Sequence, residues 1–141
     1  MVPNRIIKAL FIILLLGLPI YLAGSMYRLD KAYFICPIEY PWDVMIRCDS
    51  MGDGTFAAPR NGNRMHNGID LLAQVGTPVL ACRAGQAKVF WQKNGMGRYI
   101  EVYHNGGFST LYGHLSAIEI NNGDLVRQGQ EIGRVGKTGE F

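Results

Sequence analysis

The stretch RYIEVYHNGGFSTLYGHL, residues 98–115, decides the fold. Two runs rich in β-branched and aromatic residues, 98–104 and 108–115, flank Asn-Gly-Gly at 105–107. Apolar residues that alternate on both sides of a short Asn-Gly turn are typical of a β-hairpin. We therefore expect two antiparallel strands joined by a tight turn.

Shorter strand patterns lie on both sides of this hairpin. They occupy residues 68–73, 79–82, 85–93, 117–120, 125–129 and 131–136. Glycine-rich turn residues separate them at intervals of about ten residues, as is usual for sandwiches and barrels. The pattern predicts an all-β fold, built as a compact antiparallel sheet or sandwich.

Composition limits the size and the partners of the protein. The chain has 141 residues, of which 48% are hydrophobic and 18% charged, enough for one domain with a core. The net charge is +3, and Arg5 and Lys8 supply part of it from the N-terminal segment. The sequence has no basic stripe with interleaved aromatic residues, so we do not expect nucleic acid as a partner.

The N-terminal segment, residues 1–27, carries an export pattern. A basic stretch precedes the uncharged run ALFIILLLGLPIYLAG at 9–24. As a helix, that run is shorter than the ~30 Å thickness of a membrane's hydrocarbon core. Its length approaches this thickness if the helix continues to Tyr27. It is either a cleavable signal peptide with Ala23-Gly24-Ser25 as cleavage region, or an uncleaved membrane anchor. A buried core helix fits the flanking basic residues less well.

The rest of the chain divides at about residue 56. Residues 28–55 carry prolines and Gly/Asp turn residues and predict an irregular linker, whereas 56–141 form the expected β domain. In an exported chain Cys36 and Cys48 are able to pair and brace the linker. Cys82 would then have no disulfide partner, and we expect it to be a small buried side chain at a strand end.

His66 and Asp70 form the first candidate site. With Gly68 between them and Ile69 and Leu71 beside them, the pattern favours a strand with His66, Gly68 and Asp70 on one face. Ile69 and Leu71 then point into the core. An imidazole nitrogen and a carboxylate oxygen are ligands that Zn²⁺ accepts. The same spacing also fits a plain His–Asp hydrogen bond on an exposed sheet face.

Two further histidines end strands of the hairpin. His114 shares a strand face with Thr110 and Tyr112, and it is a candidate ligand, general base or hydrogen-bonded strand terminus. His104 stands just before the hairpin tip, a position that by itself predicts exposure to solvent.

Five motifs in order make the chain resemble the lysostaphin-type (LytM-like) zinc metallopeptidases of bacterial cell walls. They are H-x-G-x-D, GTPV-x-A, G-x-Y-x-x-x-x-H, T-x-Y-x-HLS and V-x-x-G-x-x-IG-x-VG-x-TG, and they run from about Arg60 to Gly139. Each motif is weak alone, but their common order and spacing make the set specific.

The resemblance implies an antiparallel β fold of the duplicated-hybrid-motif type with an open groove. It implies that His66 and Asp70 are zinc ligands, that His114 is the active-site histidine near the attacking water, and that His104 is structural. It further implies peptide cross-links of peptidoglycan as substrate. With the export pattern, we expect a periplasmic or cell-envelope protein. If the N-terminal segment is an uncleaved anchor, it tethers the protein to the inner membrane.

The chain departs from the family pattern at its end. The resemblance calls for an H-x-H strand after VG-x-TG, with the third zinc ligand, and no histidine follows His114. If His114 were the substitute ligand, the active-site histidine of the pattern would be lost, and His104 would have to face the groove from a hairpin end. We therefore expect a chain that is C-terminally incomplete in its peptidase domain and weakly active or inactive. The alternative is a non-catalytic module of the same fold that binds cell wall or activates a partner hydrolase such as an amidase.

A third hypothesis concerns residues 123–136, GDLVRQGQEIGRVG, which also resemble the hairpin of biotinyl or lipoyl carrier domains. Such carriers need a lysine within a motif like M-K-M at a hairpin tip. Lys88, Lys93 and Lys137 have no such surroundings, and an export signal does not suit a cytosolic carrier.

Overall fold

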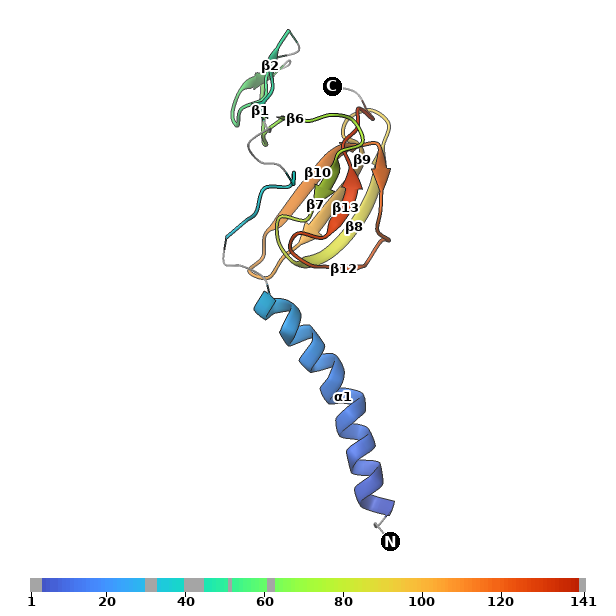
Figure 1. The fold of residues 1–141 in the computed structure, drawn as a ribbon. Coiled ribbons are helices and arrows are strands. Elements are labelled where there is room, and N and C mark those ends of the chain that lie inside the picture. Colours follow the sequence, from blue (N-terminus) through green and yellow to red (C-terminus); the bar gives the residue numbers. More distant parts are fainter. Residues whose placement is uncertain (1–3, 30–32, 40–44, 51, 61–62, 140–141) are drawn as a thin grey trace.

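The computed structural model describes residues 4–29, 33–39, 45–50, 52–60 and 63–139 (Figure 1). A single helix, α1 (Asn4–Leu29), precedes the strands in the described residues. The strands are β1 (Met45–Ile46), β2 (Cys48–Asp49), β3 (Gly52–Asp53), β4 (Pro59–Arg60), β5 (Arg64–Met65), β6 (Leu71–Leu72), β7 (Pro78–Leu80), β8 (Gly85–Gln92), β9 (Gly97–Tyr103), β10 (Ser109–Leu115), β11 (Ala117–Ile118), β12 (Leu125–Val126) and β13 (Glu131–Arg134).

The N-terminal helix that the apolar run predicts is present as α1. It extends away from the strands in Figure 1, and its apolar side chains between residues 11 and 21 are exposed. Over the described residues, no helix combines the length and the hydropathy that crossing a membrane requires.

The predicted hairpin at 98–115 is confirmed and forms one side of the larger sheet, with β10 as its edge strand. β9 and β10 pair antiparallel, and the sheet order is β10-β9-β8-β12. The turn closes through the backbone N–H of His104, which donates to the carbonyl of Phe108 at 3.0 Å. Gly106 and Gly107 have φ values of 95° and 79°, which residues other than glycine rarely adopt.

A second sheet, in the order β11-β13-β7, packs against the first and closes the core. Ile100, Val102 and Val126 of the first sheet and Ile132 of the second are fully buried. Residues 35–38 lie beside the outer edge of β7, because Ile38 forms a bridge with Val79. The predicted all-β antiparallel fold with a preceding helix is confirmed.

The described residues between 45 and 72 form a separate group of two-stranded pairs, which we call the small lobe. Its pairs are β1 with β6, β2 with β3, and β4 with β5. Residues 45–53 were expected to be irregular, and the structure differs: they contain three short strands, one of which pairs with β6 across about 25 residues of sequence. Residues 30–32, 40–44 and 51 of the expected linker, and 1–3 of the N-terminal segment, lie outside the described residues.

Candidate functional site

His66 and Asp70 lie in the small lobe, in the connection between β5 and β6. The expected continuous strand through 68–73 is wrong, since only Leu71–Leu72 is regular and the chain bends at Gly68. Ile69, expected in the core, is 56% exposed, whereas Leu71 packs against the core as expected. The bend, and not the alternation of a strand, brings the two side chains together.

Backbone hydrogen bonds from distant segments hold both residues in place. The N–H of Asp70 donates to the carbonyl of Gly54 at 2.8 Å, and the carbonyl of Asp70 accepts from Arg47 at 2.8 Å. The N–H of His66 donates to the carbonyl of Ala58 at 2.9 Å. The backbone of Asp70 is thus held between residues 47 and 54.

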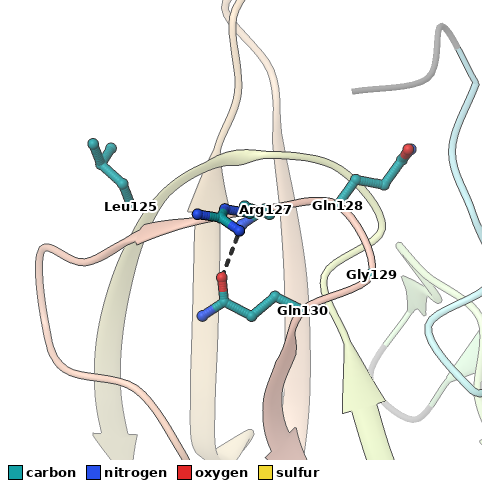
Figure 2. Close-up of a pocket in the computed structure, with 5 residues that line it drawn as sticks. All are labelled: Leu125, Arg127, Gln128, Gly129 and Gln130. Atoms are coloured by element: carbon teal, nitrogen blue, oxygen red, sulfur yellow. Dashed lines mark hydrogen bonds between the residues drawn. The ribbon is translucent and has the colours of Figure 1, made fainter. Parts of the chain in front are cut away.

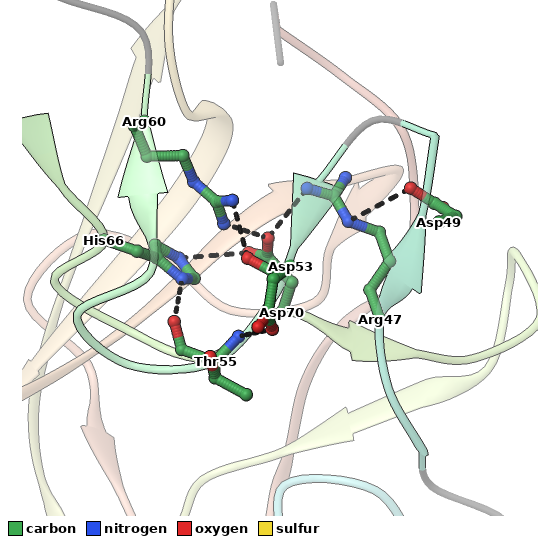
Figure 3. Close-up of polar contacts among 7 residues, drawn as sticks. All are labelled: Arg47, Asp49, Asp53, Thr55, Arg60, His66 and Asp70. Carbon is green, nitrogen blue, oxygen red and sulfur yellow. Dashed lines mark hydrogen bonds and ion pairs between the residues drawn. The ribbon is translucent and has the colours of Figure 1, made fainter.

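The His66 ring is oriented from both sides (Figure 3). Its Nδ1 lies 3.0 Å from the carbonyl oxygen of Thr55, and its Nε2 lies 3.2 Å from Oδ1 of Asp70. A carbonyl only accepts, so Nδ1 carries the hydrogen. In a neutral ring, Nε2 and Oδ1 then face each other with lone pairs, an arrangement that a shared proton or metal ion stabilises. Gly68 lies next to this pair: a Cβ added there would be 3.8 Å from Nε2.

Two arginines hold the second oxygen of Asp70. Nη2 of Arg47 and Nη2 of Arg60 lie 2.9 Å and 2.8 Å from Oδ2 (Figure 3). The carboxylate therefore presents Oδ1 toward His66 while Oδ2 is neutralised. Sequence reasoning missed both arginines, because neither spacing nor motif links residues 47 and 60 to residue 70.

Asp53 lies at the edge of the same cluster. Its Oδ1 accepts the backbone N–H of Thr55 at 2.9 Å, and hydrogen bonds from Thr55 hold the pKa of this exposed carboxyl below its usual value. The carbonyl of Asp53 also accepts from Nη1 of Arg60 at 2.6 Å. Asp53 therefore supports Thr55 and Arg60, which in turn contact His66 and Asp70.

His114 stands at the end of β10, on the larger sheet. The pairing with β9 shifts between Tyr112 and Leu115, and His114 itself has a φ of 57°. Its Nδ1 lies 2.8 Å from the carbonyl of Thr138, which again places the ring hydrogen on Nδ1. The bulge turns the His114 side chain out of the alternation of the strand.

His104 is buried, with 8% exposure, so the expectation of solvent exposure from its position alone is wrong. Its Nδ1 lies 2.8 Å from the carbonyl of Ala84, and its Nε2 lies 2.9 Å from Oγ1 of Thr110. The rings of Phe34 and Phe108 pack against it. Both ring nitrogens are thus engaged within the fold.

The three candidate histidines do not converge on one ion. Within the described ranges, no group of three or more His, Cys, Asp or Glu side chains is arranged so that it could hold a metal ion. His66 and Asp70 are brought together as the sequence predicts, whereas neither His104 nor His114 joins them in such a group.

The three cysteines, all within the described residues, are free. The Cys36–Cys48 pairing that export would permit is therefore absent from this structure. Cys48 is exposed on β2, while Cys36 and Cys82 both pack against the main core. Cys82 is half-buried at the end of β7, close to the environment expected for it.

A shallow surface pocket lies elsewhere, at the turn between β12 and β13 (Figure 2). Leu125, Arg127, Gln128, Gly129 and Gln130 line it, and the backbone N–H of Arg127 donates to Oε1 of Gln130 at 3.0 Å. This lining contains no carboxylate, histidine or thiol. It offers no group for hydrolysis, so the His66–Asp70 pair remains the candidate centre.

Comparison with known proteins identifies relatives of this chain. The family model described as Peptidase family M23 matches residues 64–141. The peptidoglycan DD-endopeptidase ShyC of Vibrio cholerae is 36% identical over 112 residues, which cover 79% of this chain and 25% of ShyC. The chain spans 22% and 17% of the lengths of two other relatives, an uncharacterized metalloprotease of Haemophilus influenzae and the DD-carboxypeptidase/endopeptidase Mpg of Neisseria meningitidis.

Solved structures agree with these matches. The crystal structure of a zinc containing peptidase from Vibrio cholerae superposes with a TM-score of 0.64 at 27% identity, covering 79% of this chain and 34% of that chain. The catalytic domain of lysostaphin from Staphylococcus simulans gives a TM-score of 0.54 at 38% identity, covering 61% of this chain and 65% of that chain. The lysostaphin-type resemblance is thereby confirmed.

Proposed function

Since this chain belongs to peptidase family M23, we propose that it acts as a zinc-dependent endopeptidase on the peptides of peptidoglycan. His66 and Asp70 are the proposed zinc ligands, and His114 is the proposed proton-transfer residue. The observation that carries the proposal is the 3.2 Å approach of His66 Nε2 to Asp70 Oδ1.

The geometry of this pair fits zinc. Zn–N and Zn–O bonds are about 2.0–2.2 Å, so two ligands of one tetrahedral zinc lie about 3.4 Å apart. The observed 3.2 Å separation is close to that value. The Nδ1 contact of His66 with the Thr55 carbonyl is the kind of outer contact that orients a ligating imidazole. The contacts of Arg47 and Arg60 do the same for the carboxylate.

The chemistry assigns separate tasks to the chain's own residues. Zinc held by these residues would lower the pKa of a bound water to about 7 and polarise a carbonyl oxygen. His66 and Asp70 would supply two ligand atoms that already lie 3.2 Å apart. The Nδ1–H of His114 contacts the Thr138 carbonyl, and Nε2 is the ring atom that we propose accepts a proton from the attacking water and returns it to the amide nitrogen.

The substrate and the location rest on the relatives and on the N-terminal segment. ShyC is named a peptidoglycan DD-endopeptidase, which supports a peptide cross-link as substrate here. We expect residues 1–27 to direct export, so that the β domain meets the cell wall outside the cytoplasm.

We propose weak activity for the chain of 141 residues. Catalytic zinc sites commonly use three protein ligands, and His66 and Asp70 are two. No histidine follows His114 in the sequence to serve as a third. We therefore expect zinc binding that depends on His66 and Asp70, with slow hydrolysis.

The test combines metal binding and hydrolysis in one set of variants. We would purify the 141-residue chain in detergent, measure bound zinc by mass spectrometry of the metal, and follow cleavage of cross-linked muropeptides by liquid chromatography and mass spectrometry. The variants are His66→Ala, Asp70→Asn and His114→Ala, with Lys93→Met as the surface control. We expect His66→Ala and Asp70→Asn to lose zinc, and His114→Ala to keep zinc but lose cleavage.

Two outcomes would contradict the proposal. Zinc binding that is unchanged in His66→Ala would remove the metal assignment. Muropeptides that bind the chain and stay uncut, with and without added zinc, would favour the non-catalytic cell-wall-binding or amidase-activating module. A chelator control with zinc added back separates metal-dependent cleavage from a contaminating hydrolase.

A further inference from the structure

Residues 135–139 lie against the end of β10, at the bulge that contains His114. The hydroxyl of Thr138 accepts the backbone N–H of Arg98 at 3.0 Å and donates to the carbonyl of Leu115 at 2.8 Å. The N–H of Thr138 donates to the carbonyl of His114 at 3.4 Å. Thr138 thus joins the start of β9 to the end of β10 through its own side chain and backbone.

The same residue contacts the His114 ring. The carbonyl of Thr138 lies 2.8 Å from Nδ1 of His114. Because a carbonyl has no hydrogen to donate, the contact requires Nδ1–H, and in the neutral ring Nε2 keeps its lone pair. The Thr138 carbonyl therefore selects the tautomer in which Nε2 is the proton acceptor.

Glycines leave little room for this segment to move. A Cβ on Gly97 would lie 2.3 Å from both the carbonyl carbon and the carbonyl oxygen of Thr138. A Cβ on Gly136 would lie 2.2 Å from the backbone nitrogen of Ser116 and 2.7 Å from the carbonyl of His114. The backbone of the segment is therefore packed directly on its neighbours, and the direction of the Thr138 carbonyl is fixed.

We propose that Thr138 is a positioning residue for His114. Its carbonyl holds the Nδ1–H tautomer, and its hydroxyl holds the carbonyl by bonding to both neighbouring strands. The inference rests on the proposed function only in giving the resulting Nε2 lone pair a use in proton transfer. The tautomer itself is a property of the fold and is measurable without substrate.

Side-chain variants separate the hydroxyl from the rest of the residue. Thr138→Val keeps the shape and the β-branch but removes the bonds to Arg98 and Leu115. Thr138→Ser keeps the hydroxyl. Ser116→Ala is the matched control, because the Ser116 hydroxyl donates to the carbonyl of Val135 at 2.7 Å and so holds the same segment at a different residue.

The experiment is long-range ¹H–¹⁵N correlation of the histidine rings in ¹⁵N-labelled protein, at a pH where the rings are neutral. We expect His114 to show a protonated Nδ1 and an unprotonated Nε2 in the wild type, Thr138→Ser and Ser116→Ala. In Thr138→Val we expect a mixture of tautomers. His66 and His104 serve as internal references, since their Nδ1 atoms contact the carbonyls of Thr55 and Ala84.

Hydrolysis by the same proteins supplies the second readout. A positioning role predicts that Thr138→Val lowers kcat about 10-fold with little change in KM, and that Thr138→Ser restores it. If Thr138→Val does not fold, as judged by its thermal transition, the wild-type spectrum alone still decides the matter. An Nε2–H tautomer of His114 there would overturn the inference.

The two proposals fail in different ways. An unchanged His114 tautomer in folded Thr138→Val, together with zinc-dependent cleavage, would overturn the role of Thr138 and leave the proposed function standing. If Thr138→Val loses the single tautomer as expected but the wild type cleaves no muropeptide, the proposed function is contradicted and the positioning role of Thr138 stands.

Discussion

The guanidinium of Arg60 lies 2.8 Å from Oδ2 of Asp70, on the oxygen that His66 does not face. Arg60 belongs to β4, and Asp70 precedes β6. The ion pair therefore connects two segments of the small lobe that no regular sheet joins, and it sets the direction of the carboxylate.

Removal of this contact should destabilise the lobe. Because both side chains are partly exposed, we expect Arg60→Met to lower the free energy of unfolding by about 1 kcal/mol. Denaturant unfolding of Arg60→Met, Asp70→Asn and the double variant measures the coupling. The exposed Lys93→Met should stay within about 0.5 kcal/mol of the wild type. Strict additivity of the two single variants would contradict the contact.

Tyr112 carries a buried hydroxyl whose loss should be costly. The backbone N–H of Cys82 donates to it at 2.8 Å, and the Thr110 hydroxyl lies 2.9 Å away. Burial raises the pKa of Tyr112, so the hydroxyl stays neutral over the whole working range. Tyr112→Phe leaves the Cys82 N–H without this acceptor and should cost about 1–3 kcal/mol in thermal or denaturant unfolding.

Tyr103→Phe is the matched control for that experiment. The Tyr103 hydroxyl donates to Glu101 at the surface, where water replaces the lost partner. We expect a change within about 0.5 kcal/mol. An equal cost for both variants would show that burial of the Tyr112 hydroxyl has no special role.

Glu101 predicts a pH dependence of stability on the acid side. Hydrogen bonds from Tyr103 and then Ser109 hold the pKa of its carboxyl below the usual 4.5. A carboxyl with a depressed folded-state pKa stabilises the fold above its unfolded pKa and loses that contribution as the pH falls through the folded value. The thermal transition temperature should therefore fall as the pH drops through and below the usual pKa of 4.5, by a modest amount because the group is exposed.

Glu101→Gln tests the assignment. We expect its transition temperature to depend less steeply on pH over that window, and the Tyr103→Phe/Ser109→Ala double variant to reduce the slope in the same sense. Parallel curves for Glu101→Gln and the wild type would place the acid sensitivity on other carboxyls.

Oxidation should join Cys36 to Cys82 and not to Cys48. Ile35 N–H donates to the carbonyl of Cys82 at 3.1 Å, so the segment that carries Cys36 runs beside the end of β7. Two thiols lose two electrons and two protons to oxidised glutathione, which is reduced to two thiols. Burial raises the pKa of the Cys82 thiol, and Cys36 raises it further, so the reaction should speed up with rising pH.

Peptide mapping under non-reducing conditions identifies the pair. Cys48→Ser should leave the cross-linked peptide unchanged, whereas Cys36→Ser and Cys82→Ser should each abolish it. A dominant Cys36–Cys48 peptide would restore the pairing that the sequence suggested.

The long strands were predictable because their signals are local. Residues 85–93, 98–104 and 108–115 alternate in hydrophobicity, and the glycines between the last two demand a turn, so β8, β9 and β10 follow from the sequence. His66 and Asp70 were also predictable as neighbours, because only four residues separate them.

The small lobe could not be predicted in the same way. Its strands are two residues long and show no periodicity, and Asp70 is held by Gly54 and Arg47 through backbone bonds. The register in which distant short segments pair cannot be predicted from their amino-acid composition. The exposure of Ile69 and the burial of His104 have the same origin, since each depends on which distant segment packs beside it.

The left-handed conformation of His114 bears on how such a protein changes by mutation. At a φ of 57°, a residue with a side chain carries a backbone cost that glycine avoids. The hydrogen bond to Thr138 offsets a cost of about the same size. We therefore expect exchange of His114 for glycine to change the free energy of unfolding little. Under the proposed function, drift can remove this histidine from a lineage while the fold survives once selection for proton transfer is relaxed, and only selection on that proposed chemistry retains it.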